Sequence, residues 1–295
     1  MLPPTAAASV TPLELIAPVL RIDELTRLPF LNHGFSTRAC GNVATRYGTA
    51  AEVAAARRTF ARVVGIDPHH VAHFALTHSS RVGLVGESDA MAIDEKPHRI
   101  SIRGLLIDAS PHDLNFTNAQ GVPNQQGVDC LVTTSQNVAL FMVVGDAAPV
   151  ILTTRNGKAV ALAHVGLAGT VNHILEHAIE ALCSITGSRT SDVIAGIGPT
   201  VGSCCYALAQ SITWGQVVAP HFFKEFGPNG PGMVLRDGQY YFDLPAAITD
   251  ILRREGVLAS QIFNSGLCTA CDNSPFFPHS RGVAGRFGTL VSLRG

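Results

Sequence analysis

The sequence predicts an α/β fold, with helices packed on a mixed β-sheet, formed as a single domain. Three observations lead to this prediction. Short runs of β-branched and apolar residues alternate along the chain with segments of helical period. Two of the β-rich runs flank Asn156-Gly157, a pair typical of a β-hairpin turn. The 295 residues contain no internal repeat and no Gly/Ser linker that would separate two domains.

The first predicted element is a helix over 50–64. Thr49 and Glu52 have the spacing of a capping box at its start, its apolar residues fall near one face, and Gly65 ends it. Between 83 and 128, scattered Gly, Pro, Asn and Asp residues predict loops with short strands.

The centre of the chain is predicted to be rich in strands. These are expected at 130–134, 138–144, 149–154, 158–164 and 193–198. Asn156-Gly157 predicts a type I′ turn between the third and fourth of them. A helix over 170–186 keeps the helical period until Gly187, and another over 244–255 follows Asp243 as its N-cap.

The composition is that of a densely packed globular protein. Hydrophobic residues make up 46% of the chain, charged residues make up 15%, and the net charge is -1. No basic face is visible, so nucleic acid is not an expected partner. The longest apolar run, at 138–153, is interrupted by Gly145, Asp146 and Pro149, so we expect no membrane span.

The N-terminal residues and the cysteines indicate a compartment. Residues 1–20 are rich in Pro and Ala, and we assign 1–29 to an N-terminal leader and 30–295 to the folded domain. No basic residue precedes Arg21 and no continuous apolar segment is present there, so we expect no signal peptide. Seven cysteines are an odd number, which favours reduced thiols in a cytoplasmic protein over a disulfide framework.

Two histidines and one aspartate form a candidate site. His164 ends a predicted strand, Asp146 follows another, and His78 lies upstream between polar residues. A hydrolytic zinc needs about three protein ligands and an open position for water. Histidines at strand ends suit such a site, because the sheet fixes the imidazoles and the loops leave room for a substrate. The alternative interpretation is two unrelated polar histidines.

Seven short motifs, in the same order, resemble those of a known family. They lie at 33–38, 77–82, 128–133, 145–150, 163–170, 197–206 and in the closing segment with Cys268, Cys271, Phe276, Phe277, Arg281, Gly285 and Arg286. The chain resembles the laccase-domain family over about 30–294. This family is also called YfiH-like or multicopper polyphenol oxidoreductase, and includes purine nucleoside phosphorylases and peptidoglycan editing factors.

The resemblance implies an α-β-β-α sandwich that holds one zinc through His, Cys and His. It also implies phosphorolysis or deamination of purine nucleosides, or hydrolytic editing of cell-wall precursors. His78 and His164 match the two histidine ligands. Asp146 matches the aspartate beside the metal, a candidate for proton transfer.

Two departures from the family pattern affect this site. Ala147 stands where the family has the cysteine ligand, and a methyl group cannot coordinate a metal. Leu167 and Ala168 replace a Trp-Arg pair, so the planar fork that an arginine offers to phosphate is missing. Asp146 could complete a two-His, one-carboxylate set for zinc or ferrous iron. Cys130, where the family has alanine, is a relocated ligand, a nucleophile activated by a histidine, or a small buried residue.

Further candidates come from the matched motifs. For substrate contact they are Arg38, Ser36, Cys205, Tyr206, Arg281 and Arg286. The arginines could instead pair with backbone carbonyls or acidic side chains. Cys204 and Cys205 are adjacent and are interpreted as packing residues, and the Cys268 and Cys271 pair is interpreted as structural because no second ribbon-like pair exists.

Three hypotheses about function remain open. The chain is an enzyme of the family type acting on a small molecule, a diverged enzyme with altered or absent metal, or a silent small-molecule binding protein, as a monomer or a homodimer. His173 and His177 have the spacing of metal ligands on a helix but are interpreted as partly exposed helix residues. Blue-copper oxidation is not expected, because the aligned cysteine and any His-x-His pair are absent.

Overall fold

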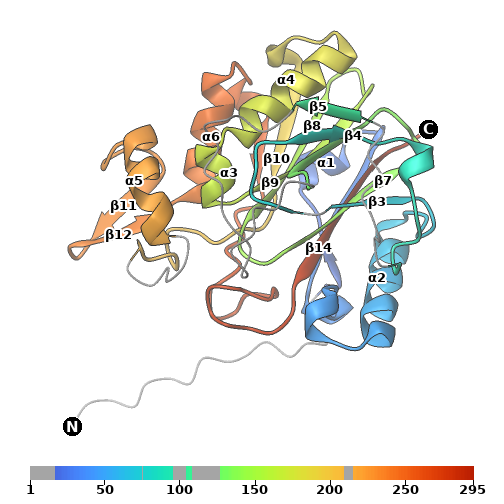
Figure 1. Ribbon diagram of the computed structural model, residues 1–295, viewed down its shortest axis with the longest axis horizontal. Coiled ribbons are helices and arrows are strands. Elements are labelled where there is room, and N and C mark those ends of the chain that lie inside the picture. Colours follow the sequence, from blue (N-terminus) through green and yellow to red (C-terminus); the bar gives the residue numbers. More distant parts are fainter. Residues whose placement is uncertain (1–16, 75, 96–103, 108–126, 209–214) are drawn as a thin grey trace.

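Two β-sheets lie face to face and helices cover their outer surfaces in the computed structural model of the chain (Figure 1). The structure describes residues 17–74, 76–95, 104–107, 127–208 and 215–295. The arrangement is an α-β-β-α sandwich with mixed sheets, so the predicted α/β fold class is confirmed.

The smaller sheet has five strands in the order β1-β2-β14-β7-β3. Their bounds are Val19–Leu20, Leu31–Ser36, Phe287–Leu293, Ala139–Val144 and Val71–His73. The last strand of the chain, β14, lies at the centre and pairs antiparallel with β2 and β7. Helix α2 (Ala50–Val64) packs on the outer face, begins with the predicted capping box and ends at Gly65.

The larger sheet has seven strands in the order β13-β10-β8-β9-β6-β4-β5. Their bounds are Ile262–Asn264, Val193–Ile197, Ala148–Thr154, Val160–Val165, Cys130–Thr133, Val82–Leu84 and Gly104–Ile107. Helices α3 (Leu167–Val171), α4 (Ile174–Thr186) and α6 (Leu244–Arg254) lie over its outer face. Since β10 and β13 are parallel neighbours, their carboxyl ends meet at one edge of this sheet.

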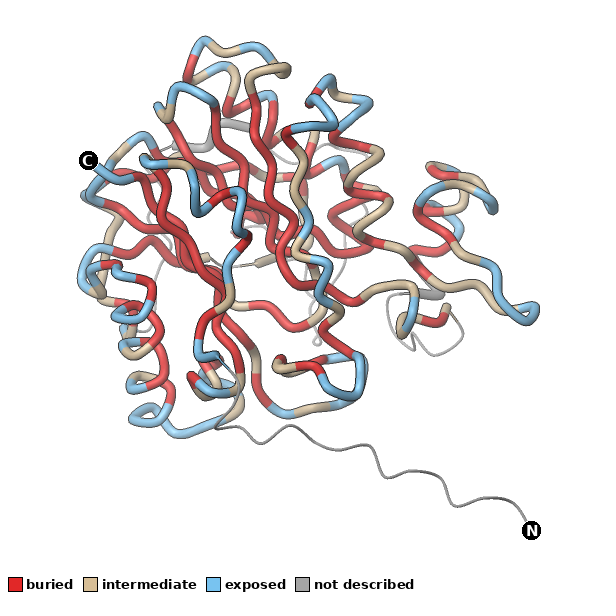
Figure 2. Tube along the Cα trace, turned by 180° about the vertical axis from the view of Figure 1, so that it is seen from behind, coloured by how far each residue is buried: buried red, intermediate tan, exposed pale blue. Residues whose placement is uncertain are grey.

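The space between the sheets is filled by side chains from both. Phe35 of β2 and Leu140 of β7 pack there with Ile151 of β8 and Leu162 of β9. Figure 2 shows that the buried residues concentrate in the strands while the exposed ones lie on the connections and outer helix faces. The central strands are buried on both faces, and their sequences are therefore nearly continuous runs of apolar residues.

A helix and a hairpin project from one side of the sandwich (Figure 1). They are α5 (Gly215–Phe226) and the pair β11 (Met233–Arg236) and β12 (Gln239–Phe242). Short 3₁₀ helices occupy Arg38–Cys40, Thr45–Tyr47, Glu87–Asp89, Thr190–Asp192 and Ala259–Gln261. No helix in the described segments combines the length and apolar character needed to cross a bilayer.

Residues 17–29, assigned to the leader, contain β1 and α1 (Asp23–Thr26), and Leu25 is fully buried. The structure corrects two predictions. The turn before β9 is not type I′, because only Gly157 has a positive φ, at 64°, and Asn156 does not. The helix predicted over 170–186 is two helices, α3 and α4, separated at His173, whose φ is 63°.

Part of the weakly patterned segment at 83–128 is seen as β4 and β5. Residues 96–103 and 108–126 of that segment lie outside the described residues.

Candidate functional site

The two histidines singled out in the sequence lie side by side. The ring centroids of His78 and His164 are 5.1 Å apart, with the ring planes at 55°. His164 lies near the end of β9, and His78 lies in the connection between β3 and β4. His78 has a φ of 59°, and the side chain of Asn172 donates a hydrogen bond to its carbonyl at 2.9 Å. A left-handed non-glycine residue costs on the order of 1–3 kcal/mol, and such strain is frequent at functional sites.

A buried carboxylate that the sequence analysis missed holds His164 in place. Asp129 Oδ1 lies 3.1 Å from His164 Nδ1, and Asp129 Oδ2 accepts the backbone N–H of Ser79 at 2.7 Å and of Thr77 at 3.1 Å. Burial raises the pKa of Asp129, but its hydrogen bonds and the charges of the two imidazoles lower that pKa by more. Asp129 therefore stays ionised. The sequence feature that could have identified Asp129 is its position between apolar residues at the start of a buried strand, where a charged group needs a partner.

These contacts fix the proton positions of the pair. An ionised carboxylate can only accept a hydrogen bond, so His164 carries its hydrogen on Nδ1 and keeps Nε2 as an acceptor when the ring is neutral. Burial, and then the charge of His164, lower the pKa of His78 to about 4. His78 is therefore neutral near pH 7.

The described side chains do not give this pair a third metal ligand. Pro149 pairs with His164 across the sheet, so Ala147, two residues earlier, lies on the face of His164. Ala147 lies against Gly166, because a Cβ added at Gly166 would be 3.4 Å from the methyl carbon of Ala147. Within the described residues, no group of three His, Cys, Asp or Glu ligands includes either histidine. The residues therefore fit a three-ligand zinc poorly, as the substitution at Ala147 indicated.

Asp146 lies in the short connection by which the chain passes from β7 of one sheet to β8 of the other. Its Oδ1 accepts the hydroxyl of Thr269 at 2.7 Å and its Oδ2 accepts the backbone N–H of Ser280. The carboxylate is thus bound to the C-terminal loops. The structure does not bring it into one ligand set with the two histidines.

The structure does not bring Cys130 to the histidines either. Its strand neighbour Asp129 bonds to His164, and neighbouring side chains on a strand point to opposite faces. Cys130 is fully buried among the residues beneath α4, with Ala163 opposite it in β9. Burial raises the pKa of its thiol. These are the properties of a small buried residue, the alternative interpretation of Cys130.

Three of the predicted substrate contacts are occupied by other protein groups. Ser36 is fully buried, and its hydroxyl accepts the backbone N–H of Gly288 at 2.8 Å, so it lies inside the sheet. Arg38 donates to the carbonyl of Phe276. Arg286 donates to the hydroxyl of Tyr47 at 3.0 Å.

The remaining three lie in the C-terminal half of the chain, near one another. Tyr206 packs on Phe242, with ring centroids 5.4 Å apart. Arg281 Nη2 lies 3.8 Å from the sulfur of Cys205 and 3.4 Å from a carboxylate oxygen of Asp272.

The four cysteines of the two C-terminal motifs come together in space. The sulfur atoms of Cys204, Cys205, Cys268 and Cys271 all lie within 4.8 Å of one another. The interpretation of the first pair as packing residues and of the second as a structural motif did not predict that the two pairs meet. Spacing along the chain gave no signal, because 62 residues lie between Cys205 and Cys268.

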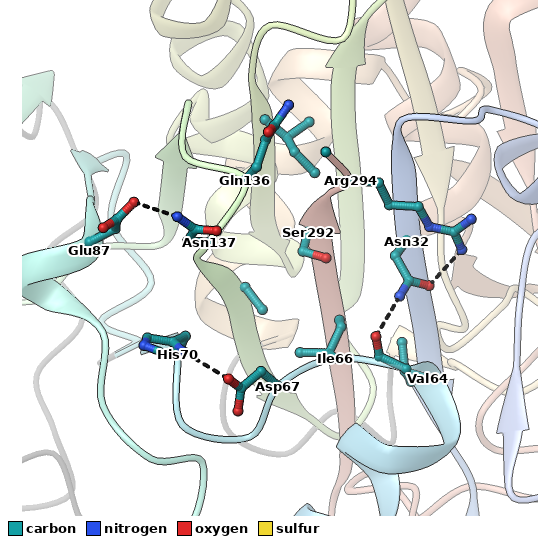
Figure 3. A pocket seen from close by; sticks show the side chains of 14 residues that line it. Asn32, Val64, Ile66, Asp67, His70, Glu87, Gln136, Asn137, Ser292 and Arg294 are labelled. Atoms are coloured by element: carbon teal, nitrogen blue, oxygen red, sulfur yellow. Dashed lines mark hydrogen bonds and ion pairs between the residues drawn. The ribbon is translucent and has the colours of Figure 1, made fainter.

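A cavity of about 790 Å³ lies elsewhere, at the end of β6 opposite to His164 (Figure 3). Its lining includes Asn32, His70, Glu87, Asn137 and Arg294. None of the predicted site residues is among those that line it. Its polar groups are largely paired with one another, as in the hydrogen bond from Asn137 to Glu87 at 2.9 Å.

Comparisons with known proteins agree with the motifs. Adenosine deaminase RL5, from an unknown prokaryotic organism, is 28% identical over 229 residues, which are 77% of this chain and 75% of that protein. A purine nucleoside phosphorylase of Xylella fastidiosa is 32% identical over 166 residues, covering 55% of this chain and 60% of the relative. The structure of the hypothetical protein YfiH of Bacillus licheniformis superposes with a TM-score of 0.73 at 23% identity, covering 95% of this chain and 98% of that one. Residues 32–294 match the family described as multi-copper polyphenol oxidoreductase laccase, and the chain belongs to that family.

Proposed function

We propose that the chain is an enzyme that acts on a purine nucleoside, or a related small polar metabolite, at the pair His78 and His164. The observation that carries this proposal is the arrangement of Asp129, His164 and His78, in which an ionised, buried carboxylate holds one imidazole beside a second, neutral one. The names of the relatives, adenosine deaminase and purine nucleoside phosphorylase, support the substrate class.

The geometry suits general acid–base catalysis. In the proposed mechanism, His164 Nε2 accepts the proton of an attacking water, and Asp129 stabilises the imidazolium that forms. His78 is neutral near pH 7, so its ring does not repel that positive charge. Asp146, in this proposal, transfers a proton to or from the leaving group. No step uses a metal, because the described residues supply only two ligands.

Water is the proposed co-reactant in place of phosphate. Ala168 is buried at 4% exposure where an arginine would have bound an anion. Deamination or hydrolysis is therefore favoured over phosphorolysis.

A second candidate is a silent binding protein on the same scaffold. Two residues favour it. Ala147 stands where the family has a cysteine ligand, and Ala168 stands where it has an arginine, so two groups that could take part in catalysis are missing. Such a protein would bind a nucleoside without converting it.

The test is an incubation of the untagged protein with adenosine or inosine, with and without phosphate, followed by chromatography of the products. We expect turnover that does not depend on phosphate. His164→Asn and Asp129→Asn should each lower the rate by about 100-fold or more, because each removes part of the general base. His70→Asn, at an exposed histidine near the opposite end of β6, is the matched control and should keep the rate.

Two results would contradict the proposal. Base release that requires phosphate would overturn the choice of water. No product from either nucleoside, together with a rise in Tm on adding adenosine, would leave the binding protein as the answer.

A further inference from the structure

We propose that Cys204, Cys205, Cys268 and Cys271 form a tetrahedral zinc site, separate from the histidine pair. The sulfur of Cys271 lies 3.6 Å from that of Cys204 and 3.7 Å from that of Cys205. Four thiolates around zinc, each at about 2.3 Å, would be about 3.8 Å from one another. A disulfide needs a sulfur–sulfur distance of about 2.05 Å. These two distances match the edge of such a tetrahedron and are too long for a covalent bond, and the remaining sulfur pairs lie within 4.8 Å.

The fold explains how two distant pairs meet. One pair follows β10 and the other follows β13, and these parallel strands end at the same edge of the sheet. The pairing continues past the strands, because Thr200 and Cys268 form a parallel bridge and Thr269 donates its backbone N–H to the carbonyl of Thr200 at 3.0 Å. Backbone contacts thus hold the two loops together without a metal.

A tight turn brings the adjacent cysteines to one point. The backbone N–H groups of Cys205 and Tyr206 both donate to the carbonyl of Gly202, at 3.0 and 3.1 Å. With the chain folded back in this way, the sulfurs of Cys204 and Cys205 both reach Cys271. In this turn, two adjacent cysteines can therefore contribute to one metal site.

Two hydrogen-bond donors lie beside sulfur atoms of the cluster. The backbone N–H of Gly202 donates to the sulfur of Cys268 at 3.3 Å. The guanidinium of Arg281 lies 3.8 Å from the sulfur of Cys205. Soft thiolate ligands select zinc over magnesium or calcium, and binding releases the thiol protons to solvent.

The site would be structural and would support the wall beside Asp146. The hydroxyl of Thr200 donates to the carbonyl of Asp146 at 2.7 Å, and the hydroxyl of Thr269 donates to its carboxylate. Both threonines belong to the loops that carry the cysteines. Cys204 and Cys271 are exposed, so a chelator can reach the ion.

The test uses the untagged, full-length protein, reduced, stripped with a chelator and titrated with Co²⁺ without oxygen. We expect one Co²⁺ per chain with the visible bands of tetrahedral cobalt thiolate, which Zn²⁺ then bleaches. Cys271→Ser and Cys204→Ser change exposed residues, and each should weaken zinc binding at least about tenfold. Cys183→Ser, at a cysteine of α4 outside the cluster, is the matched control and should bind as the unchanged protein does.

A variant of the histidine pair is included in the same titration. It separates a failure of the zinc site from a failure of the proposed function. His78→Asn with His164→Asn should leave the cobalt thiolate bands unchanged. Absence of these bands in the unchanged protein, or an unchanged affinity for metal in Cys271→Ser, would overturn the zinc site. A third result would also contradict the zinc site. If the metal-free protein without reductant has a mass lower by two hydrogens, and neither the oxidised nor the reduced protein binds Co²⁺, the cysteines form a disulfide and not a metal site.

Discussion

Ala147 is the residue that separates the histidine pair from a three-ligand site. It lies directly before β8 on the face of His164, and it is half-buried beside Gly166. We expect Ala147→Cys to create a metal site at His78 and His164, because a thiolate there adds the missing soft ligand. The measurement is zinc content in a Cys268→Ser, Cys271→Ser background, where the cysteine cluster is removed. About one added zinc per chain is the expected result.

Ala148→Cys is the control for that change. Ala148 is fully buried and belongs to the core beneath α4, so its side chain points away from His164. A thiol at this position should bind no zinc. Equal zinc content in the two variants would mean that Ala147 does not face the histidines.

At the scale of single residues, the sequence identified the two histidines by motif but not the carboxylate that bonds to His164. His78 and His164 stood out because polar rings at strand ends suggest chemistry. Asp129 carried no such mark, since its role depends on a contact across 35 residues of sequence. The same reason hid the cysteine cluster.

At the scale of elements, helix ends that are encoded by nearby residues were predicted well. Features that depend on the backbone conformation of single non-glycine residues or on the position of a turn were not. Helix α2 was predicted to its last residue, because the capping box and Gly65 are encoded within the segment itself. The break between α3 and α4 was missed, because it depends on the left-handed backbone of His173 and not on a Gly or Pro. The hairpin turn was misjudged because Gly157 has positive φ one position after the turn's central residues, Arg155 and Asn156.

The capping box of α2 gives a prediction at this scale. The side chain of Thr49 accepts the backbone N–H of Glu52, and Glu52 accepts that of Thr49. Thr49→Ala should lower the free energy of unfolding by about 1 kcal/mol, measured by urea denaturation. Thr59→Ala, within the same helix, is the control and should leave that free energy unchanged or raise it slightly, because alanine is the better helix former. Equal effects at the two positions would contradict a role of the cap.

At the scale of the whole molecule, stability depends on pH through buried histidines, and His33 and His73 add to the contribution of His78. His33 lies in β2, and its Nε2 accepts the backbone N–H of Ile22 at 2.9 Å, which only an unprotonated nitrogen can do. Burial, then the charges of Arg21 and Arg294, lower the pKa of His33 to about 4. Burial, then the charge of Arg57, lower the pKa of His73 to about 4 as well.

These two rings make the folded protein less stable in acid. Between pH 6.5, the ordinary value for histidine, and about 4, the unfolded chain binds protons that the folded chain does not. Their contribution to stability is therefore complete above pH 6.5 and is lost as the pH falls toward 4, by at most roughly 3 kcal/mol for each ring. Urea midpoints measured across this window should fall with pH. His33→Gln keeps an acceptor for Ile22 without a titrating ring and should reduce the slope, whereas His70→Asn, at an exposed histidine, should keep it. A midpoint that stays constant across the window would mean that neither ring is held neutral by the fold.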